Sequence, residues 1–223
     1  MMSKEDFIAY NPIRIDATES LYKSEIYYKW LDTRRSVREF SSKPVSKEVI
    51  KNVIKSASTA PSGAHKQPWT FCAISDPGIK TSIRKAAEKE EYTNYHKRMS
   101  QEWLSDLKQF GTNWEKPFLE VAPWLIAVFY KAFDVNDKGE KLNNYYVKES
   151  VGLACGLLLS AIHNAGLCAL THTPSPMNFL SRILNRPKNE RPFLLIPVGY
   201  PAEDCMVPDL QRKPLELIAA WYE

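Results

Sequence analysis

Apolar residues recur along the chain at helical spacing in several long stretches, which polar turns separate. The spacing predicts an amphipathic helix at 21–31 and a second at 46–58, with Ser46 as its N-cap. The longest pattern, at 146–166, has small residues on one side and leucines on the other, and it predicts a central, buried helix. Two further helices are predicted, one that begins at Asp76-Pro77 and carries 80–90, and one at 178–185.

Four short runs of β-branched, aromatic and other apolar residues predict strands. They lie at 70–74, 124–130, 167–171 and 193–198. The stretch 134–142 is polar and is expected to be a loop. Because helices alternate with strands, the pattern favours an α+β fold with α/β-type layers, in which helices flank a central mixed sheet.

The length of 223 residues suits a single domain. Within it, 1–33 are expected to form an N-terminal arm and helix, and 203–223 a C-terminal extension. The segment 88–116 differs from the rest because it is charged and aromatic, with few aliphatic residues. It predicts helical material that lies over the body of the protein, and active-site lids are often weakly buried insertions of this kind.

Composition narrows the class of function. A net charge of +4, with acidic and basic residues interleaved, argues against a nucleic-acid partner. The longest apolar run, 151–162, is shorter than the roughly 18–20 residues that span a bilayer. The acidic start at 1–6 is unlike a secretory signal, so no membrane association is expected. The 4 cysteines and 4 histidines show no metal-ligand spacing, and three cysteines lie in apolar stretches, which predicts reduced thiols and a cytoplasmic protein.

The segment Arg34-Arg35-Ser36-Val37-Arg38 follows the first predicted helix and combines three guanidinium groups with a hydroxyl. In an extended segment alternate side chains share a face, so Arg34, Ser36 and Arg38 are able to contact one ligand. Arginine suits phosphate because its planar fork donates two hydrogen bonds at once. Taken alone, the run also fits a solvated basic loop. The chain has no GxGxxG or GxxxxGKS/T motif, so arginines would have to hold the phosphate of a nucleotide.

Four separated segments invite one explanation. They are RRSVR at 34–38, PSGAH at 61–65, THTP at 171–174 and RKP at 212–214. Around them, QPWTF at 67–71, PVGYP at 197–201 and VPDL at 207–210 complete the pattern. This combination resembles the FMN-dependent nitroreductase superfamily, and more closely its iodotyrosine deiodinase branch, over 34–214 without large gaps.

The resemblance implies a nitroreductase-like fold, FMN as the cofactor, and a homodimer of the domain-swapped type in which each site takes residues from both subunits. The residues implied to hold the FMN phosphate and the flavin edge are Arg34, Arg35, Ser36, Arg38 and Arg212. Those implied to line the flavin are Pro61, Ser62 and Gly63, because a glycine-containing loop lets the backbone approach a planar ring.

Two positions are implied to act at the reacting atoms. Thr173 would place its hydroxyl at the flavin N5, with Thr171 nearby, and Ala64 would donate its backbone N–H to a phenolate oxygen of the substrate. A donor at N5 favours the release of electrons one at a time, as the breaking of an aryl–iodine bond requires. Taken alone, Thr173 also fits a turn residue that satisfies the backbone at a strand end.

Three residues of the expected lid are implied to bind an amino-acid substrate. Glu91 and Tyr95 are four residues apart, so they share one face of a helix. The branch pattern implies that Glu91 accepts from the substrate ammonium, that Lys116 pairs with its carboxylate, and that Tyr95 adds a hydroxyl and an aromatic wall. Out of context, the two charged residues also fit solvated surface positions.

The combined prediction is FMN-dependent reductive dehalogenation of halotyrosines, chiefly 3-iodo- and 3,5-diiodo-L-tyrosine and also bromo- and chlorotyrosine, to tyrosine and halide. Electrons are expected to come from NAD(P)H, directly or through a reductase. Two alternatives stay open from the sequence. One is a general nitroreductase or flavin reductase, and the other is a non-catalytic protein that binds flavin or halotyrosine.

Overall fold

The computed structural model describes residues 7–223, which fall into two units that meet between Arg34 and Arg35. In the first unit, an extended arm over 7–16 precedes α1 (Ala17–Asp32). Asp16 caps this helix, because its carboxylate accepts from the Glu19 N–H at 2.8 Å. The helix expected at 21–31 is confirmed with a longer start, and the part of the expected arm at 1–6 lies outside the described residues.

The second unit contains a four-stranded sheet in the order β1-β2-β6-β5, in which every neighbouring pair is antiparallel. All four predicted strands are present, as β1 (Trp69–Ile74), β2 (Trp124–Lys131), β5 (Cys168–Ala169) and β6 (Glu190–Gly199). The α+β fold with helices around a central sheet is therefore confirmed, but its named strands do not form the mixed sheet that was expected. The parallel pairing recorded within 7–223 is an isolated bridge between Ser36 and Ala169. Helices between two strands do not impose parallel pairing when the connection is long enough to return along either direction.

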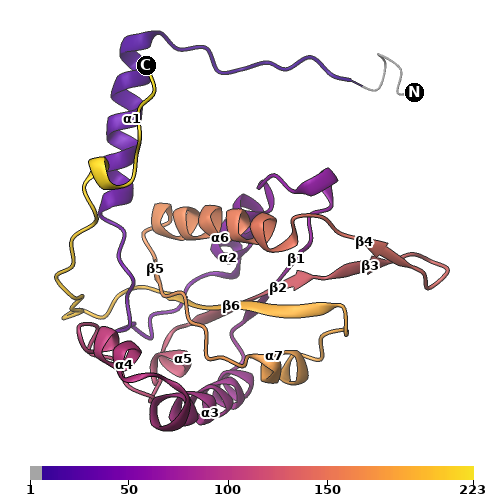
Figure 1. Cartoon of the computed structure of the whole chain (residues 1–223), viewed down its shortest axis with the longest axis vertical. Coiled ribbons are helices and arrows are strands. Elements are labelled where there is room, and N and C mark those ends of the chain that lie inside the picture. Colours follow the sequence, from indigo (N-terminus) through magenta and orange to yellow (C-terminus); the bar gives the residue numbers. More distant parts are fainter. Residues whose placement is uncertain (1–6) are drawn as a thin grey trace. The chain divides into compact units, whose positions relative to one another are not determined.

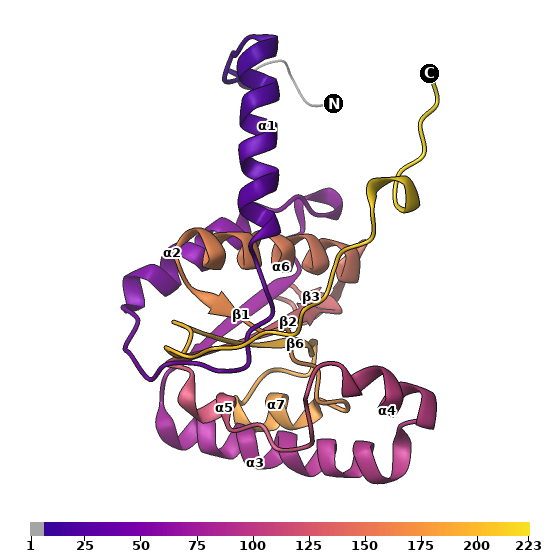
Figure 2. The same ribbon diagram turned by 90° about the vertical axis from the view of Figure 1, so that its left-hand side faces the viewer.

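Helices cover both faces of this sheet (Figures 1 and 2). On one face lie α2 (Lys47–Ser58) and α6 (Val147–Asn164), and on the other lie α3 (Pro77–Thr93), α5 (Phe118–Val121) and α7 (Asn178–Ile183). The alternating side chains of β2 divide between the two layers. Ile126 and Val128 belong to the core shared with α6, whereas Leu125, Ala127 and Phe129 belong to the core shared with α3 and α5.

One predicted loop is wrong. The stretch 134–142 contains parts of a β-hairpin, β3 (Phe133–Val135) and β4 (Lys141–Asn143). The Asn136 side-chain oxygen accepts from the N–H groups of Lys138 and Glu140 at 3.0 and 2.9 Å, and Gly139 has φ 80°. The polar turn residues dominated the sequence pattern, and the two strands are too short to show an apolar alternation.

The segment 88–116 contains helical material, as expected, but three of its polar residues are buried. After α3 the chain makes a π-helical turn, η3 (Asn94–Arg98), and then α4 (Gln101–Lys108), which Ser100 caps. Glu91, Asn94 and Lys116 are buried, and each whole residue is exposed by 7% or less. Beyond β6, the stretch 203–223 has no helix or strand apart from η4 (Leu215–Leu217).

The predicted reduced thiols are confirmed. All four cysteines are free, and Cys155 lies on the core-facing side of α6, where burial raises the pKa of its thiol to about 12. Among residues 7–223, no helix combines the length and the apolar character needed to cross a bilayer. No group of three acidic, histidine or cysteine side chains able to hold a metal ion occurs in that same part of the chain.

Candidate active site

The second half of the arginine segment pairs with the sheet. The Val37 N–H donates to the Ala169 carbonyl at 3.1 Å, which places Arg35, Ser36 and Arg38 beside the end of β5. The Arg35 guanidinium donates to the carbonyl of Pro208, so the C-terminal extension lies against the same segment. Two motifs that are about 170 positions apart in the sequence therefore meet at one edge of the sheet.

The chain beyond β5 presents alternate residues to opposite sides. Thr171 and Thr173 are exposed, whereas His172 between them is 8% exposed and pairs its backbone with Leu195 in both directions, at 2.9 and 3.0 Å. The His172 ring packs edge-on against Phe118 of α5, with centroids 5.6 Å apart. The two threonines are thus left exposed, on the side of the chain opposite to the buried His172 ring.

Lys116 and Glu91 form a buried ion pair. The Lys116 Nζ lies 3.3 Å from a Glu91 carboxylate oxygen, and the two side chains are only 4% and 9% exposed. The ammonium also donates to the Thr112 hydroxyl at 3.3 Å and to the carbonyl of Asn113. Burial lowers the pKa of Lys116, and the nearby Glu91 carboxylate opposes that shift. An ion pair held out of water in this way is able to exchange partners with a ligand that carries both charges.

Tyr95 completes the predicted lid triad. Its ring lies 5.4 Å from the Lys116 Nζ, within cation–π range. Its hydroxyl is hydrogen-bonded with Thr112, and burial raises its pKa. Arg38 is close to the same group, because it contributes to the electrostatic environment of Tyr95 and packs over the Phe110 ring at 5.6 Å. The structure therefore brings the predicted lid residues and one predicted cofactor arginine into one site.

Positive charge dominates this site. Burial lowers the pKa of His172 to about 3, and the neighbouring Lys116 and Arg38 lower it further by repelling an imidazolium. Burial also lowers the pKa of Arg38. His172 is consequently neutral at physiological pH, and its Nε2 is buried without a hydrogen-bond partner in the described structure. A site with two cations and a single buried carboxylate favours ligands that bring phosphate or carboxylate groups.

The loop predicted to line the flavin lies elsewhere in the fold. Pro61 to Ala64 follow α2 and enter a single 3-10 turn, η2 (Gly63–His65), where Ala64 has φ 47°. The Gly63 N–H donates to the Ser150 hydroxyl of α6 at 3.4 Å, and the Ser62 hydroxyl accepts from the Gln67 N–H at 2.9 Å. Within 7–223, no recorded contact joins this loop to Arg35, Arg38 or Thr173.

Gly63 has a local reason to be glycine. A Cβ built on it would lie 2.8 Å from the Tyr145 carbonyl oxygen, closer than any ordinary contact. The absence of a side chain therefore permits the loop to pack on the backbone that leads into α6. Next to it, the Ala64 N–H donates no hydrogen bond to the rest of the described chain, so it is available to a ligand.

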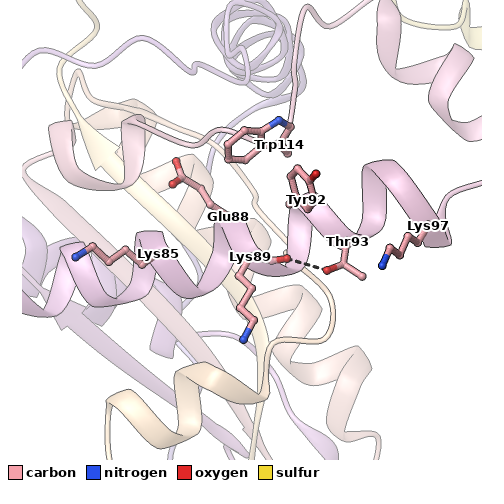
Figure 3. Close-up of a pocket in the computed structure, with 7 residues that line it drawn as sticks. All are labelled: Lys85, Glu88, Lys89, Tyr92, Thr93, Lys97 and Trp114. Carbon is pink, nitrogen blue, oxygen red and sulfur yellow. Dashed lines mark hydrogen bonds between the residues drawn. The ribbon is translucent and has the colours of Figure 1, made fainter.

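Arg34 and Arg212 are the two remaining predicted arginines. Arg34 is the last residue of the first unit, and Arg212 is exposed in the C-terminal extension, four residues beyond Pro208. The surface groove in Figure 3 is lined by Lys85, Glu88, Lys89, Tyr92, Thr93, Lys97 and Trp114, none of which is a predicted site residue. The candidate site is therefore not this groove.

Two polar residues at the site, Asn94 and Thr112, were not predicted from the sequence. Asn94 is buried and its amide donates to the Ser175 carbonyl at 2.8 Å, which ties η3 to the turn after Thr173. Thr112 contacts both Tyr95 and Lys116. The position of Asn94, three residues after Glu91 on the same helical face, was the available signal.

Comparison with known proteins places these features in a family. The nitroreductase family profile matches residues 31–200. A protein of Haliscomenobacter hydrossis named iodotyrosine deiodinase is 62% identical over 222 residues, which is 100% of both chains. The chain belongs to the iodotyrosine deiodinase branch of the nitroreductase family.

Other members of this deiodinase branch are more distant in sequence. The zebrafish (Danio rerio) iodotyrosine deiodinase is 48% identical and covers 93% of this chain and 71% of its own. A crystal structure described as oxidised iodotyrosine deiodinase bound to FMN and 3-iodo-L-tyrosine superimposes with a TM-score of 0.74. That protein is 31% identical and covers 88% of this chain and 99% of its own.

Proposed function

We propose that this deiodinase-branch protein is an FMN-dependent enzyme that reductively dehalogenates halotyrosines. The observation that carries the proposal is the buried pair of Glu91 and Lys116 beside Tyr95 and Arg38. A general nitroreductase acting on uncharged aromatics has no need of a buried carboxylate and ammonium at its substrate site, because their desolvation is costly. A zwitterionic substrate does need one group of each sign.

The residues present fit FMN. Arg35, Ser36 and Arg38 lie on one segment at the sheet edge and supply guanidinium and hydroxyl donors suited to a phosphate. Thr171 and Thr173 are exposed at the end of the neighbouring strand. When bound, FMN supplies the electrons that break the carbon–halogen bond. Arg212 is proposed to join these donors, since the segment before it is tied to Arg35.

Binding of the zwitterion is proposed to proceed by exchange of ion-pair partners. The substrate ammonium replaces Lys116 beside Glu91, and the substrate carboxylate replaces Glu91 beside Lys116. No charge is left unpaired in this exchange. Because Glu91 and Lys116 are already buried in the free protein, ligand binding adds no further cost for desolvating them. A ligand with only one charge would leave either Glu91 or Lys116 buried without a partner.

The phenolate end of the substrate is proposed to lie at Ala64, whose free N–H is directed by the left-handed backbone of η2. Hydrogen bonding there favours the ionised phenol. The reaction consumes two electrons and one proton per halide, because the carbon–iodine bond is replaced by a carbon–hydrogen bond and iodide leaves. The Thr173 hydroxyl is proposed to hydrogen-bond to the flavin and to favour one-electron steps.

A second copy of the chain is proposed to complete each site. The Ala64 loop packs at the start of α6, whereas Arg38 and Thr173 lie near β5, which follows the end of that helix, as expected if the two groups meet between subunits. The outer face of α6 supports this, because Leu153 and Leu157 are 55% and 38% exposed. Contiguous exposed apolar surface of this kind marks interaction sites. The C-terminal extension adds further exposed apolar side chains, namely Leu215, Leu217, Ile218, Trp221 and Tyr222.

Two parts of the proposal concern the cell. Electrons are proposed to come from NAD(P)H, directly or through a reductase. A comparison of turnover with NADPH and with dithionite as the reductant tests this source. A cytoplasmic location is supported by four free thiols, because disulfides form mainly in oxidising compartments. Cell fractionation tests it.

The function is tested by titration of the FMN-loaded protein with three ligands while flavin fluorescence is measured. We expect 3-iodo-L-tyrosine to quench at low concentration, because it carries the iodophenol and both backbone charges. L-Tyrosine and 2-iodophenol, which each lack one of these parts, should require at least about tenfold more, equivalent to about 1.4 kcal/mol. Equal quenching by 2-iodophenol and iodotyrosine would favour a general aromatic reductase.

A further inference from the structure

Helix α3 contacts the segment 114–122 at several positions along its length. The two segments run in opposite directions. Tyr92 packs edge-on against Trp114, with ring centroids 5.4 Å apart. Two turns earlier on α3, Arg84 reaches the Glu120 carboxylate at 3.4 Å. At the start of the helix, the Lys80 ammonium donates to the carbonyls of Glu120 and Ala122, both at 2.8 Å. The paired positions therefore descend along α3 as they ascend along the partner segment: Tyr92–Trp114, Arg84–Glu120 and Lys80–Ala122.

In the middle of this series, Glu88 holds the backbone of Lys116. The Glu88 carboxylate accepts from the Lys116 backbone N–H at 2.7 Å, and the same oxygen accepts from the Arg84 Nε at 2.8 Å. The Glu88 side chain is 17% exposed, so the contact is largely screened from water. In Figure 3, Glu88 and Tyr92 project from α3 toward the side on which Trp114 lies, whereas Lys89 projects away.

Lys116 is thus bound at two points by residues one helical turn apart. Glu88 binds its backbone N–H, and Glu91 binds its ammonium. The contact with Glu91 must be given up when a substrate carboxylate takes its place, but the contact with Glu88 is not affected by that exchange. Glu88 is therefore the contact that keeps the Lys116 backbone in place while its side chain changes partner.

We propose that Glu88 is a positioning residue that sets Lys116 to receive the substrate carboxylate. This inference rests on the proposed function, because it assigns to Lys116 the carboxylate of a halotyrosine. Glu88 itself touches neither substrate nor cofactor. Its effect reaches the substrate only through the location of Lys116, so it should alter recognition of the carboxylate and leave recognition of the aromatic ring unchanged.

The experiment compares two ligands that differ by the carboxylate alone, 3-iodo-L-tyrosine and 3-iodotyramine, by flavin-fluorescence titration of the FMN-loaded protein. Glu88→Ala should raise the Kd of iodotyrosine about tenfold and change that of iodotyramine less than about twofold. Glu88→Gln should recover most of the loss, because its amide oxygen still accepts from the Lys116 N–H. The matched control is Glu90→Gln, which alters the neighbouring surface ion pair with Arg98 and should leave both constants unchanged.

Two further measurements separate the possible outcomes. In a Lys116→Met background, Glu88→Ala should have no additional effect on iodotyrosine binding, because the residue through which it acts has been removed. If the alanine variant does not retain FMN, Glu88→Asp, whose carboxylate is one methylene short, takes its place in the same comparison. Equal weakening of both ligands, or full additivity with Lys116→Met, would overturn the proposal.

Amide hydrogen exchange tests the contact without reference to any substrate. Exchange of the Lys116 N–H should be faster in Glu88→Ala than in the wild type and unchanged in Glu90→Gln. If the wild-type protein fails to bind iodotyrosine but the Lys116 N–H still exchanges faster in Glu88→Ala than in the wild type, the proposed function is wrong and the structural role of Glu88 stands. If iodotyrosine binds and Glu88→Ala changes neither its Kd nor the exchange rate, Glu88 does not position Lys116.

Discussion

Removal of one member of the Glu91–Lys116 pair should destabilise the protein far more than removal of both. At an Nζ–carboxylate distance of 3.3 Å, two unit charges attract by about 5 kcal/mol at an effective dielectric constant of about 20. Most of this attraction offsets the cost of burying the charges, so the net value of the pair is small. Lys116→Met, however, leaves the Glu91 carboxylate buried alone, and we expect a loss of about 3 kcal/mol in the free energy of unfolding.

The assay is urea unfolding of the two single variants, Lys116→Met and Glu91→Gln, and of the double variant. The double variant should lose at least about 2 kcal/mol less than the sum of the single losses, because neither charge is then left without its partner. The matched control is the pair of Arg98 and Glu90 on the same stretch of helix. Its atoms are closer, at 2.8 Å, but its side chains are 48% and 25% exposed.

Water and salt screen the exposed pair, so its coupling energy should be about 0.5 kcal/mol despite the shorter distance. The reasoning predicts that burial, and not distance, ranks the two pairs. Equal coupling in both pairs, or additive losses at Glu91 and Lys116, would show that this pair is not desolvated and would remove the basis for the exchange of partners with a zwitterion.

Three further predictions concern single positions. Thr173→Ala should lower iodide release by about tenfold or more while raising the reduction of nitroaromatics, because loss of the hydroxyl favours two-electron transfer; unchanged rates of both reactions would contradict its assigned role. His172→Leu should flatten the pH dependence of unfolding between pH 6.5 and 4.5. The folded-state pKa of His172, about 3, lies below its ordinary value of 6.5, so the wild type loses stability as the pH falls through this window. The expected loss is about 2–3 kcal/mol in the free energy of unfolding, measured by urea titration at each pH. Gly63→Ala should cost about 2 kcal/mol, measured by thermal unfolding, because the added Cβ meets the Tyr145 carbonyl oxygen at 2.8 Å; a neutral effect would show that the loop is able to shift.

The elements with a strong apolar period were predictable from sequence. The helices at 47–58 and 147–164 and the strands at 69–74 and 124–131 match their predicted positions to within about two residues. The strand expected at 167–171 is reduced to Cys168–Ala169, because the chain leaves the ladder after Ala169 and pairs again only at His172. Periodicity indicates which residues are buried, but it does not report where backbone pairing stops.

The sequence motifs predicted which residues of the lid would lie together, but not the contacts that these residues make. The sequence indicated Glu91, Tyr95 and Lys116 as substrate-binding residues, and the structure places them together. It did not indicate that Glu91 and Lys116 neutralise each other, since a sequence separation of 25 gives no distance in space. Glu88 was equally hidden, because a carboxylate that accepts from a backbone N–H looks like any surface charge in sequence.

The face of the sheet toward which the His172 side chain points was also not predictable from the sequence. Between two threonines at a strand end, a histidine is able to face either side of the sheet, and the sequence left this open. The backbone pairing with Leu195 turns its ring toward Phe118 and exposes the two threonines. The alternation of a strand assigns neighbours to opposite faces, but only a tertiary contact decides which face is which.

The most direct test of the proposed chemistry is a single turnover under anaerobic conditions. FMN-loaded protein is reduced with dithionite, excess reductant is removed, and 3-iodo-L-tyrosine is added while iodide, tyrosine and flavin absorbance are measured. The account predicts one iodide and one tyrosine formed for each reduced FMN that is reoxidised, and no comparable turnover of 2-iodophenol. Binding of iodotyrosine without release of iodide would contradict it and would identify the protein as a halotyrosine-binding flavoprotein without this activity.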